Sequence, residues 1–133
     1  MTPAKLRELA GLVEARKARD LARLDALLAE DRRLAAEIAG VMVTGARDLA
    51  TGIALPLPQQ ALRQAWADQR IRVAHRRRAE LAPAIRAARA EALQSLGKHR
   101  ALENLVERAD RTAARLAAAR TEREAPAPEA GHD

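Results

Sequence analysis

The sequence contains no cysteine, no phenylalanine and no tyrosine, and Trp66 is its only tryptophan. The lack of cysteine excludes disulfides and cysteine-based zinc sites. Aromatic side chains usually supply much of a globular core, so we do not expect a compact core. No apolar run approaches the roughly 20 residues of a membrane span, and the N-terminus has no apolar block of signal-peptide length. We therefore expect a cytoplasmic protein without membrane insertion.

Alanine, leucine, arginine and glutamate dominate instead, and 32% of the 133 residues are charged. This composition is typical of long helices and coiled coils, and the length allows one domain at most. We expect an elongated protein held together by a thin apolar seam.

Positive charge is concentrated in one segment. The formal net charge is +6, and residues 59–90 carry eight arginines against Asp68 and Glu80, which accounts for all of it. Arginine favours planar contacts with carboxylate or phosphate. The segment could therefore meet an acidic protein surface or a nucleic acid.

A first amphipathic helix is predicted over about residues 3–41. Thr2 followed by Pro3 reads as a helix cap and first helical position. Apolar residues then recur at seven-residue spacing. One row is Leu6, Val13, Leu27, Leu34 and Val41; a second is Ala10, Leu24 and Ile38; and Leu21, Leu28, Ala35 and Met42 widen the stripe. Lys17, Asp20 and Asp31 interrupt it.

A connecting segment is predicted over about 42–57, because Gly40, Gly45 and the neighbouring β-branched residues weaken a helix there. Pro58 is expected to open a second helix over about 58–124. Pro83 lies inside this helix and should kink it without ending it. Residues 125–133 are rich in proline and alanine, and we expect a disordered tail.

The second helix has an apolar stripe with an unbroken alternation of three- and four-residue steps. The stripe comprises Ile85, Ala88, Ala92, Ser95, His99, Leu102, Val106, Ala109, Ala113 and Leu116, extended upstream by Leu62, Trp66, Val73, Ala74 and Leu81. The predicted fold is all-α: an elongated antiparallel two-helix coiled-coil hairpin whose second helix is longer. Its seam then outruns the first helix, which indicates an outside partner or a homodimer.

The arginine-rich stretch divides among several faces of this helix. With straight-helix geometry, Arg70 and Arg77 fall near the centre of the stripe, whereas Arg76 lies on the back. We hypothesise that Asp31 pairs with Arg70 or Arg77 and sets the register, a role attested for polar seam residues. Trp66 falls at the stripe's margin, where packing in the seam is favoured over exposure for a partner.

Catalytic and metal-binding patterns are missing. Gly97-Lys98 lacks the other elements of a phosphate-binding loop. His75, His99 and His132 are too widely spaced to suggest a metal site, and His99 reads as a seam histidine. A two-helix hairpin also offers no concave pocket that excludes water. We expect neither an enzyme nor a bound cofactor.

Residues 92–116 read ALQSLGKHRALENLVERADRTAARL. The pattern formed by Gly97, Arg100, Leu102, Leu105 and Arg108 resembles the C-terminal signature of the FliJ-like proteins. These are small coiled-coil proteins of flagellar type III export, related to the YscO-like stalk proteins of injectisomes. Trp66 and the arginine-rich stretch after it are also similar to divergent members.

The resemblance implies a hairpin stalk whose joined terminal ends insert into the export ATPase ring, while another part contacts the export gate and substrate chaperones. It implies a cytoplasmic location, peripheral to a membrane-embedded apparatus. The residues carried over to the ATPase-facing seam are Leu102, Leu105, Val106, Arg108 and Leu116; those carried over to the gate-facing surface are Trp66, Val73 and Arg76. Arg70 departs from the family pattern, where an apolar residue is usual.

Two other functions remain open from the residues alone. One is a structural coiled coil of another assembly, such as a peripheral stalk or a scaffold. The other is non-specific nucleic-acid binding, for which the charge of residues 59–90 would suffice. A lone tryptophan is a poor stacking platform, so the sequence favours this function least.

Overall fold

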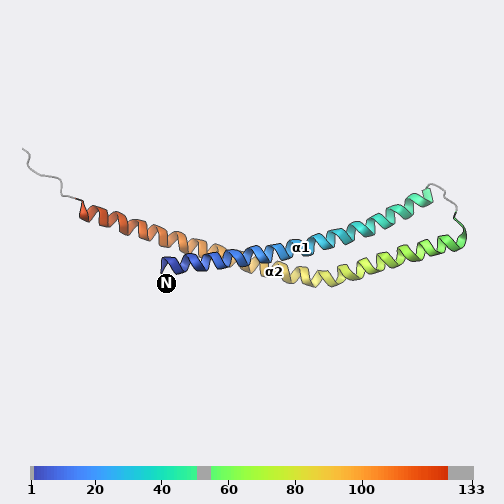
Figure 1. The fold of residues 1–133 in the computed structure, drawn as a ribbon, viewed down its shortest axis with the longest axis horizontal. Helices are drawn as coiled ribbons and strands as arrows, with labels where there is room; N and C mark the ends of the chain where they lie inside the picture. The colour runs from blue at the N-terminus through green and yellow to red at the C-terminus, as the bar shows by residue number, and fades with distance from the viewer. Residues whose placement is uncertain (1, 51–54, 126–133) are drawn as a thin grey trace, which may run out of the picture. The chain divides into compact units, whose positions relative to one another are not determined.

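The computed structural model describes residues 2–50 and 55–125, and their regular structure is entirely α-helical. Helix α1 spans Pro3–Ala50 and helix α2 spans Leu57–Glu124 (Figure 1). The all-α prediction is confirmed. None of the helices in this part of the chain is both long and apolar enough to cross a membrane.

Local chemistry accounts for the helix starts. The backbone N–H of Lys5 donates to Oγ1 of Thr2 at 3.3 Å, which is the N-cap geometry expected of Thr2 before Pro3. At α2, the backbone N–H groups of Gln59 and Gln60 donate to the carbonyl of Pro56. Pro58 is thus the second helical residue rather than the first, where its missing N–H still costs no helical hydrogen bond.

The expected end of the first helix, at about residue 41, is wrong, because α1 continues to Ala50. Gly40 and Gly45 lower helix propensity by about 1 kcal/mol each relative to alanine, but each added residue of an existing helix gains a hydrogen bond. Asp48 also contacts Arg63 of α2 at 3.2 Å, so the extra turns have tertiary contacts. Residues 51–54 of the predicted connection and 126–133 of the predicted tail lie outside the described residues.

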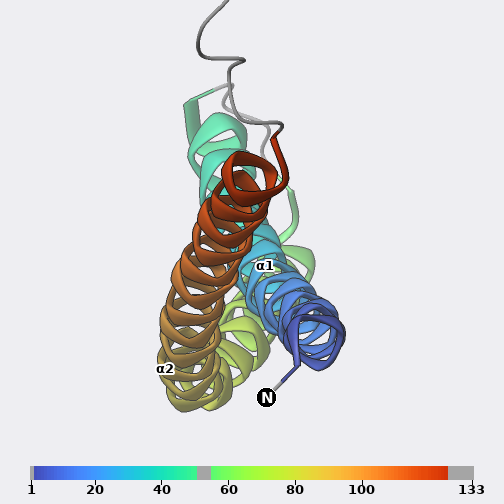
Figure 2. The same cartoon turned by 90° about the vertical axis from the view of Figure 1, so that its left-hand side faces the viewer.

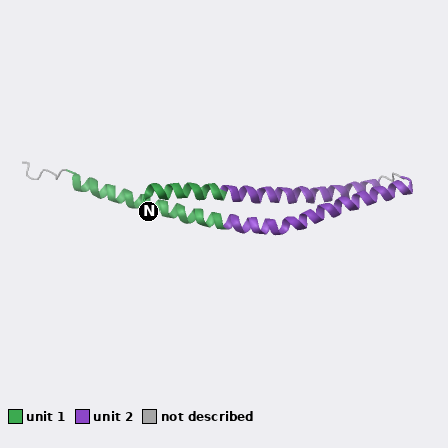
Figure 3. Ribbon diagram, turned by 60° about the horizontal axis from the view of Figure 1, so that its bottom comes forward, with its two compact units in different colours: residues 1–17, 94–133 green, residues 18–93 purple. Residues whose placement is uncertain are grey.

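The chain divides into two compact units (Figure 3). Unit 1 comprises residues 1–17 and 94–133, and unit 2 comprises residues 18–93. Within each unit a segment of α1 lies beside a segment of α2 and runs in the opposite direction (Figures 1 and 2). Both units therefore have the antiparallel pairing that the sequence predicts for a helical hairpin.

The seven-residue rows of α1 are confirmed. Every member of both rows is buried or half-buried, including the polar residues that interrupt them, Lys17, Asp20 and Asp31. The buried apolar residues are Ile38, Ala74, Leu81, Ala88 and Ala92, all in unit 2. Most are alanines, so this seam is as thin as the composition suggests.

Along α2 covered residues recur at alternating steps of three and four from Ala67 to Ala109, and Ala84, Glu91 and Leu96 beside this row are half-buried as well. The predicted stripe from Ile85 to Ala109 is confirmed. Its upstream extension through Leu62, Trp66 and Val73 is wrong, because these side chains are exposed. The covered positions there are Ala67, Ile71, Ala74, Arg78 and Leu81.

Pro83 lies within α2, which continues on both sides of it as expected. Pro83 itself is exposed, and the seam residues Leu81 and Ile85 on either side stay covered. The seam is therefore unbroken at the proline. The kink expected there stays a prediction.

Candidate protein-interaction surfaces

The predicted ATPase-facing residues of unit 1 divide into two groups. Leu102 and Val106 are half-buried members of the stripe that faces α1. Leu105, Arg108 and Leu116 are exposed. Only the second group is open to a partner while the two helices of this unit stay paired.

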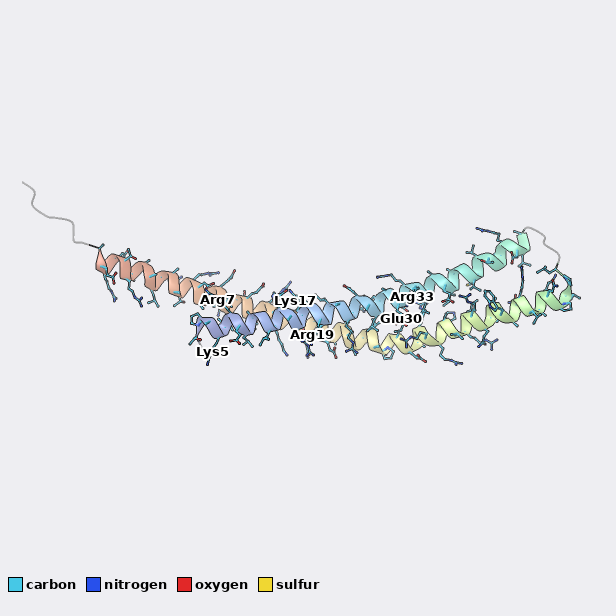
Figure 4. The ribbon with its side chains drawn as sticks, viewed as in Figure 1. Lys5, Arg7, Lys17, Arg19, Glu30 and Arg33 are labelled. Carbon is cyan, nitrogen blue, oxygen red and sulfur yellow. The ribbon has the colours of Figure 1, made fainter. Side chains whose placement is uncertain are left out.

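The C-terminal part of α2 extends past the start of α1. In unit 1, Nη2 of Arg7, only four residues after Pro3, donates to Oδ1 of Asp110 at 2.9 Å (Arg7 is labelled in Figure 4). All residues from Asp110 to Ala118 are exposed, and Leu116 exposes 59% of its surface. The expected seam positions Ala113 and Leu116 therefore have no cover from α1 among the described residues.

His99 occupies the seam of unit 1, as the sequence predicts. Its Nε2 contacts Oε2 of Glu14 on α1 and lies 3.5 Å from Oε1 of Glu103, and 14% of its side chain is exposed. Nζ of Lys17 lies 3.1 Å from the same Glu14 oxygen. The hydrogen bond from Lys17 and, after it, the nearby His99 hold the pKa of Glu14 below its ordinary value. This cluster joins the two helices.

In unit 2, ion pairs join α1 to one flank of α2. Arg70 contacts Glu37 at 2.5 Å and Arg77 contacts Glu30 at 2.7 Å (Glu30 is labelled in Figure 4). Both the arginines and the glutamates are seven residues apart, so the pairs repeat with the heptad. The hydrogen bond from Arg77 lowers the pKa of Glu30, and the same contact raises the pKa of Arg77.

The expected partner of Asp31 is wrong. Asp31 accepts a hydrogen bond from Nε of Arg78 at 2.9 Å, and this part-buried contact also raises the pKa of Arg78. Arg70 and Arg77 are more exposed and use glutamates on the flank. The covered stripe is centred between Leu81 and Arg78 and not on Leu81, so Arg78 lies inside it and Arg77 lies on its flank. A coiled-coil stripe also follows 3.5 residues per turn and not 3.6, and over the longer distance from Leu81 to Arg70 this moves Arg70 onto the flank.

Trp66 is 57% exposed, so the expectation that it packs in the seam is wrong. The guanidinium carbon of Arg70 lies 4.9 Å from the centre of its ring, within cation–π distance. Val73, one heptad further on, is 53% exposed, and Arg76 is exposed as well. The predicted gate-facing residues are therefore all accessible in unit 2.

Large apolar side chains are also exposed where α1 ends and α2 begins. They are Met42, Val43, Leu49, Leu57 and Leu62. Gly45, one heptad after Ile38, is exposed, and a Cβ placed there would meet nothing within 4 Å. The two helices are loosely packed in this part of unit 2.

No cluster of three or more metal-ligating side chains occurs within residues 2–50 and 55–125. Every buried side-chain nitrogen and oxygen in the same ranges has a hydrogen-bond partner. No family model matches the sequence, and no similar protein was found among the curated proteins or the solved structures.

Proposed function

We propose that this chain is a non-enzymatic interaction protein: a FliJ-like stalk of the flagellar type III export apparatus that links the export ATPase to the export gate. It acts in the cytoplasm beside the membrane-embedded apparatus and uses no cofactor. Support comes from the signature formed by Gly97, Arg100, Leu102, Leu105 and Arg108. The observation that carries the proposal is the exposed end of α2 from Asp110 to Ala118 in unit 1.

Where one helix extends past the end of the helix it packs against, an exposed apolar side chain on it is suited to contact a protein partner. Leu116 is such a side chain, and Leu105 and Arg108 lie upstream on the same helix. In this proposal these three residues contact the ATPase. Leu102 and Val106 act indirectly, because their half-buried side chains hold α2 against α1.

The second contact uses Trp66, Val73 and Arg76 of unit 2. Trp66 and Val73 share a heptad row and are both exposed, and tryptophan and arginine are the residue types that most often dominate the binding energy of an interface. Arg70, which departs from the family pattern, lies over the Trp66 ring. The gate or a substrate chaperone would therefore meet an arginine-covered tryptophan instead of an apolar row.

The direct test is binding of the purified chain to the export ATPase from the same genome. Leu105→Asp/Leu116→Asp should abolish co-purification, because two charges would enter the proposed contact. Leu12→Asp/Leu93→Asp is a matched control, since both leucines are 65% exposed elsewhere. Circular dichroism establishes that both variants remain helical. Unchanged binding by Leu105→Asp/Leu116→Asp would contradict the proposal that these leucines contact the ATPase.

A structural coiled coil of another assembly is the second candidate. The heptad-spaced pairs Arg70–Glu37 and Arg77–Glu30 favour it, because such a row gives a fixed two-helix scaffold without any need for a moving partner. The same binding assay separates the two functions. A scaffold of another assembly has no affinity for the export ATPase, and self-association through Leu116 would appear as a doubled mass that Leu116→Asp reduces.

A further inference from the structure

Four arginines on α2 of unit 2 are left over from the ion-pair network: Arg72, Arg76, Arg86 and Arg89. All four are exposed, and within the described residues none of them makes a hydrogen bond or an ion pair. Their neighbours behave differently, since Arg63, Arg70, Arg77 and Arg78 all pair with acidic residues of α1. Arg89 lies on the side of the helix, about 77° from the centre of the covered stripe, whereas the other three lie on its outer surface. We call Arg72, Arg76 and Arg86 the arginine face.

The acidic residues of α2 in this unit are already engaged. Asp68 accepts a hydrogen bond from Gln64 at 3.0 Å. Glu80 lies 3.4 Å from Arg77, and Glu91 lies 3.7 Å from Arg23. No carboxylate of α2 in unit 2 is therefore left to neutralise the arginine face.

The seam fixes where these arginines point. With 3.5 residues per turn, Arg76 falls directly opposite the centre of the covered stripe, and Arg72 and Arg86 fall about 50° to one side. Val73 and Trp66 fall about 50° to the other side, and both are exposed. From Arg72 to Arg86 the face is roughly 21 Å long, at 1.5 Å per residue. The row of Trp66 and Val73 continues with Glu80, which is paired with Arg77. The cationic surface thus has an apolar edge at its upstream end only.

We propose that the arginine face binds an acidic amphipathic helix of a partner protein. A helix with carboxylates along one edge and apolar residues along the next would meet arginines and Val73 together, in the manner of a third coiled-coil strand. Arginine suits carboxylates because its planar guanidinium can donate two parallel hydrogen bonds. The inference rests on the proposed function, because Arg76 belongs to its second contact, and it adds the chemistry of the partner.

Phosphate groups would neutralise the same charges, but the surroundings favour a protein helix. One face of the only tryptophan is covered by Arg70, which leaves at most one face of a single ring for stacking on a base. Val73 and Trp66 add apolar surface beside the arginines, and an amphipathic helix can cover this surface whereas a phosphate backbone cannot. An oligonucleotide is therefore included in the test as the competing ligand.

The test uses the full chain and a synthetic helical peptide of about 20 residues, with glutamates at four-residue spacing beside a row of leucines. Fluorescence anisotropy of the labelled peptide gives the dissociation constant. The variant R72Q/R76Q/R86Q should weaken binding about tenfold, as expected for the loss of several charge contacts at a partly exposed interface. A peptide of equal composition with its glutamates spread around the helix should bind more weakly to the unchanged chain.

The matched control is R19Q/R32Q/R33Q, which removes the same charge from three exposed arginines of α1 in the same unit. It should bind the peptide within about twofold of the unchanged chain. Equal weakening in both variants, no weakening in either, or no binding at all would overturn the proposal. So would a single-stranded oligonucleotide that binds more tightly than the peptide. The assay contains no ATPase, so its failure leaves the ATPase test of the proposed function standing.

Discussion

Leu81→Ala is expected to destabilise the helical pair of unit 2 by about 3 kcal/mol. Leu81 is the largest fully buried side chain among the described residues, with 2% of its surface exposed. The change removes three carbons, each worth about 0.8 kcal/mol when buried. A residual cavity adds to this, within the roughly 2–5 kcal/mol typical of buried leucine-to-alanine changes. A thin seam between two helices can partly collapse, which places the expectation at the lower half of that range.

The assay is unfolding by heat and by urea, followed through the circular dichroism of the helices. For a chain of this size a loss of this order lowers the melting temperature by about 10 °C. Leu93→Ala is the matched control, because Leu93 lies on the same helix in the same unit and is 65% exposed. It should stay within about 0.5 kcal/mol of the unchanged chain. Equal losses in the two variants would refute the assignment of the seam.

Three further predictions concern unit 2. Gly40→Ala should stabilise the chain by about 1 kcal/mol in urea unfolding, because the added Cβ meets nothing within 4 Å, and a loss would reveal a contact there. Because Arg77 holds the pKa of Glu30 below its ordinary 4.5, the ionised Glu30 stabilises the fold above about pH 4.5 and this stabilisation is lost as the pH falls further. Glu30→Gln should therefore make melting temperatures less dependent on pH in acid, and an unchanged profile would contradict the pairing. Trp66 fluorescence should be quenched by acrylamide almost as strongly as in the urea-unfolded chain, since the residue is 57% exposed, whereas strong protection would show it to be covered.

The covered rows of α1 were predictable because they depend on spacing alone. Leu6, Val13 and Leu27 recur every seven residues, and a helix places such residues on one side whatever the rest of the chain does. The same logic placed Ser95 and His99 of α2 in the seam. Lys17, Asp20 and Asp31, the charged residues that interrupt the apolar rows of α1, are covered as well.

The end of α1 was not predictable from propensity. Gly40 and Gly45 disfavour a helix locally, yet α1 continues past both. Propensity is a weak prior beside the cooperativity of a long helix. The contact of Asp48 with Arg63 depends on α2, 15 residues further along the chain, and a local pattern does not contain it.

The predicted pairing of Asp31 and the predicted packing of Trp66 were wrong because of the helical angles assumed for α2. A straight helix with 3.6 residues per turn drifts by about 20° per heptad from the 3.5-residue repeat. From Leu81 back to Trp66 this drift is about 40°, which is enough to bring Trp66 to the edge of the stripe. Arg78 is only three residues from Leu81, and it is excluded by centring the stripe on Leu81 instead of between Leu81 and Arg78. Continuing the steps of three and four upstream from Ile85 would have placed Arg78 in the seam opposite Asp31. The sequence contained that signal.

The exposure of Trp66 also follows from this phase, because Ala67 takes the covered position beside it. The position of Arg70 over the ring is a tertiary detail, since the same guanidinium is held by Glu37 of α1. Neither contact has a sequence pattern of its own. The exposure of Trp66 and its cover by Arg70 emerged only with the structure, and the role of this surface in binding a partner stays a prediction.

The central claim is that one chain holds two protein partners at the same time through different parts of α2. Sedimentation velocity with the export ATPase, this chain and a fluorescently labelled soluble part of the export gate tests it directly. The label should sediment with the ATPase only when the chain is present, and Leu105→Asp/Leu116→Asp should release the ATPase while the label stays on the chain. If the gate fragment and the ATPase displace each other from the chain, or if neither binds it, the claim is contradicted.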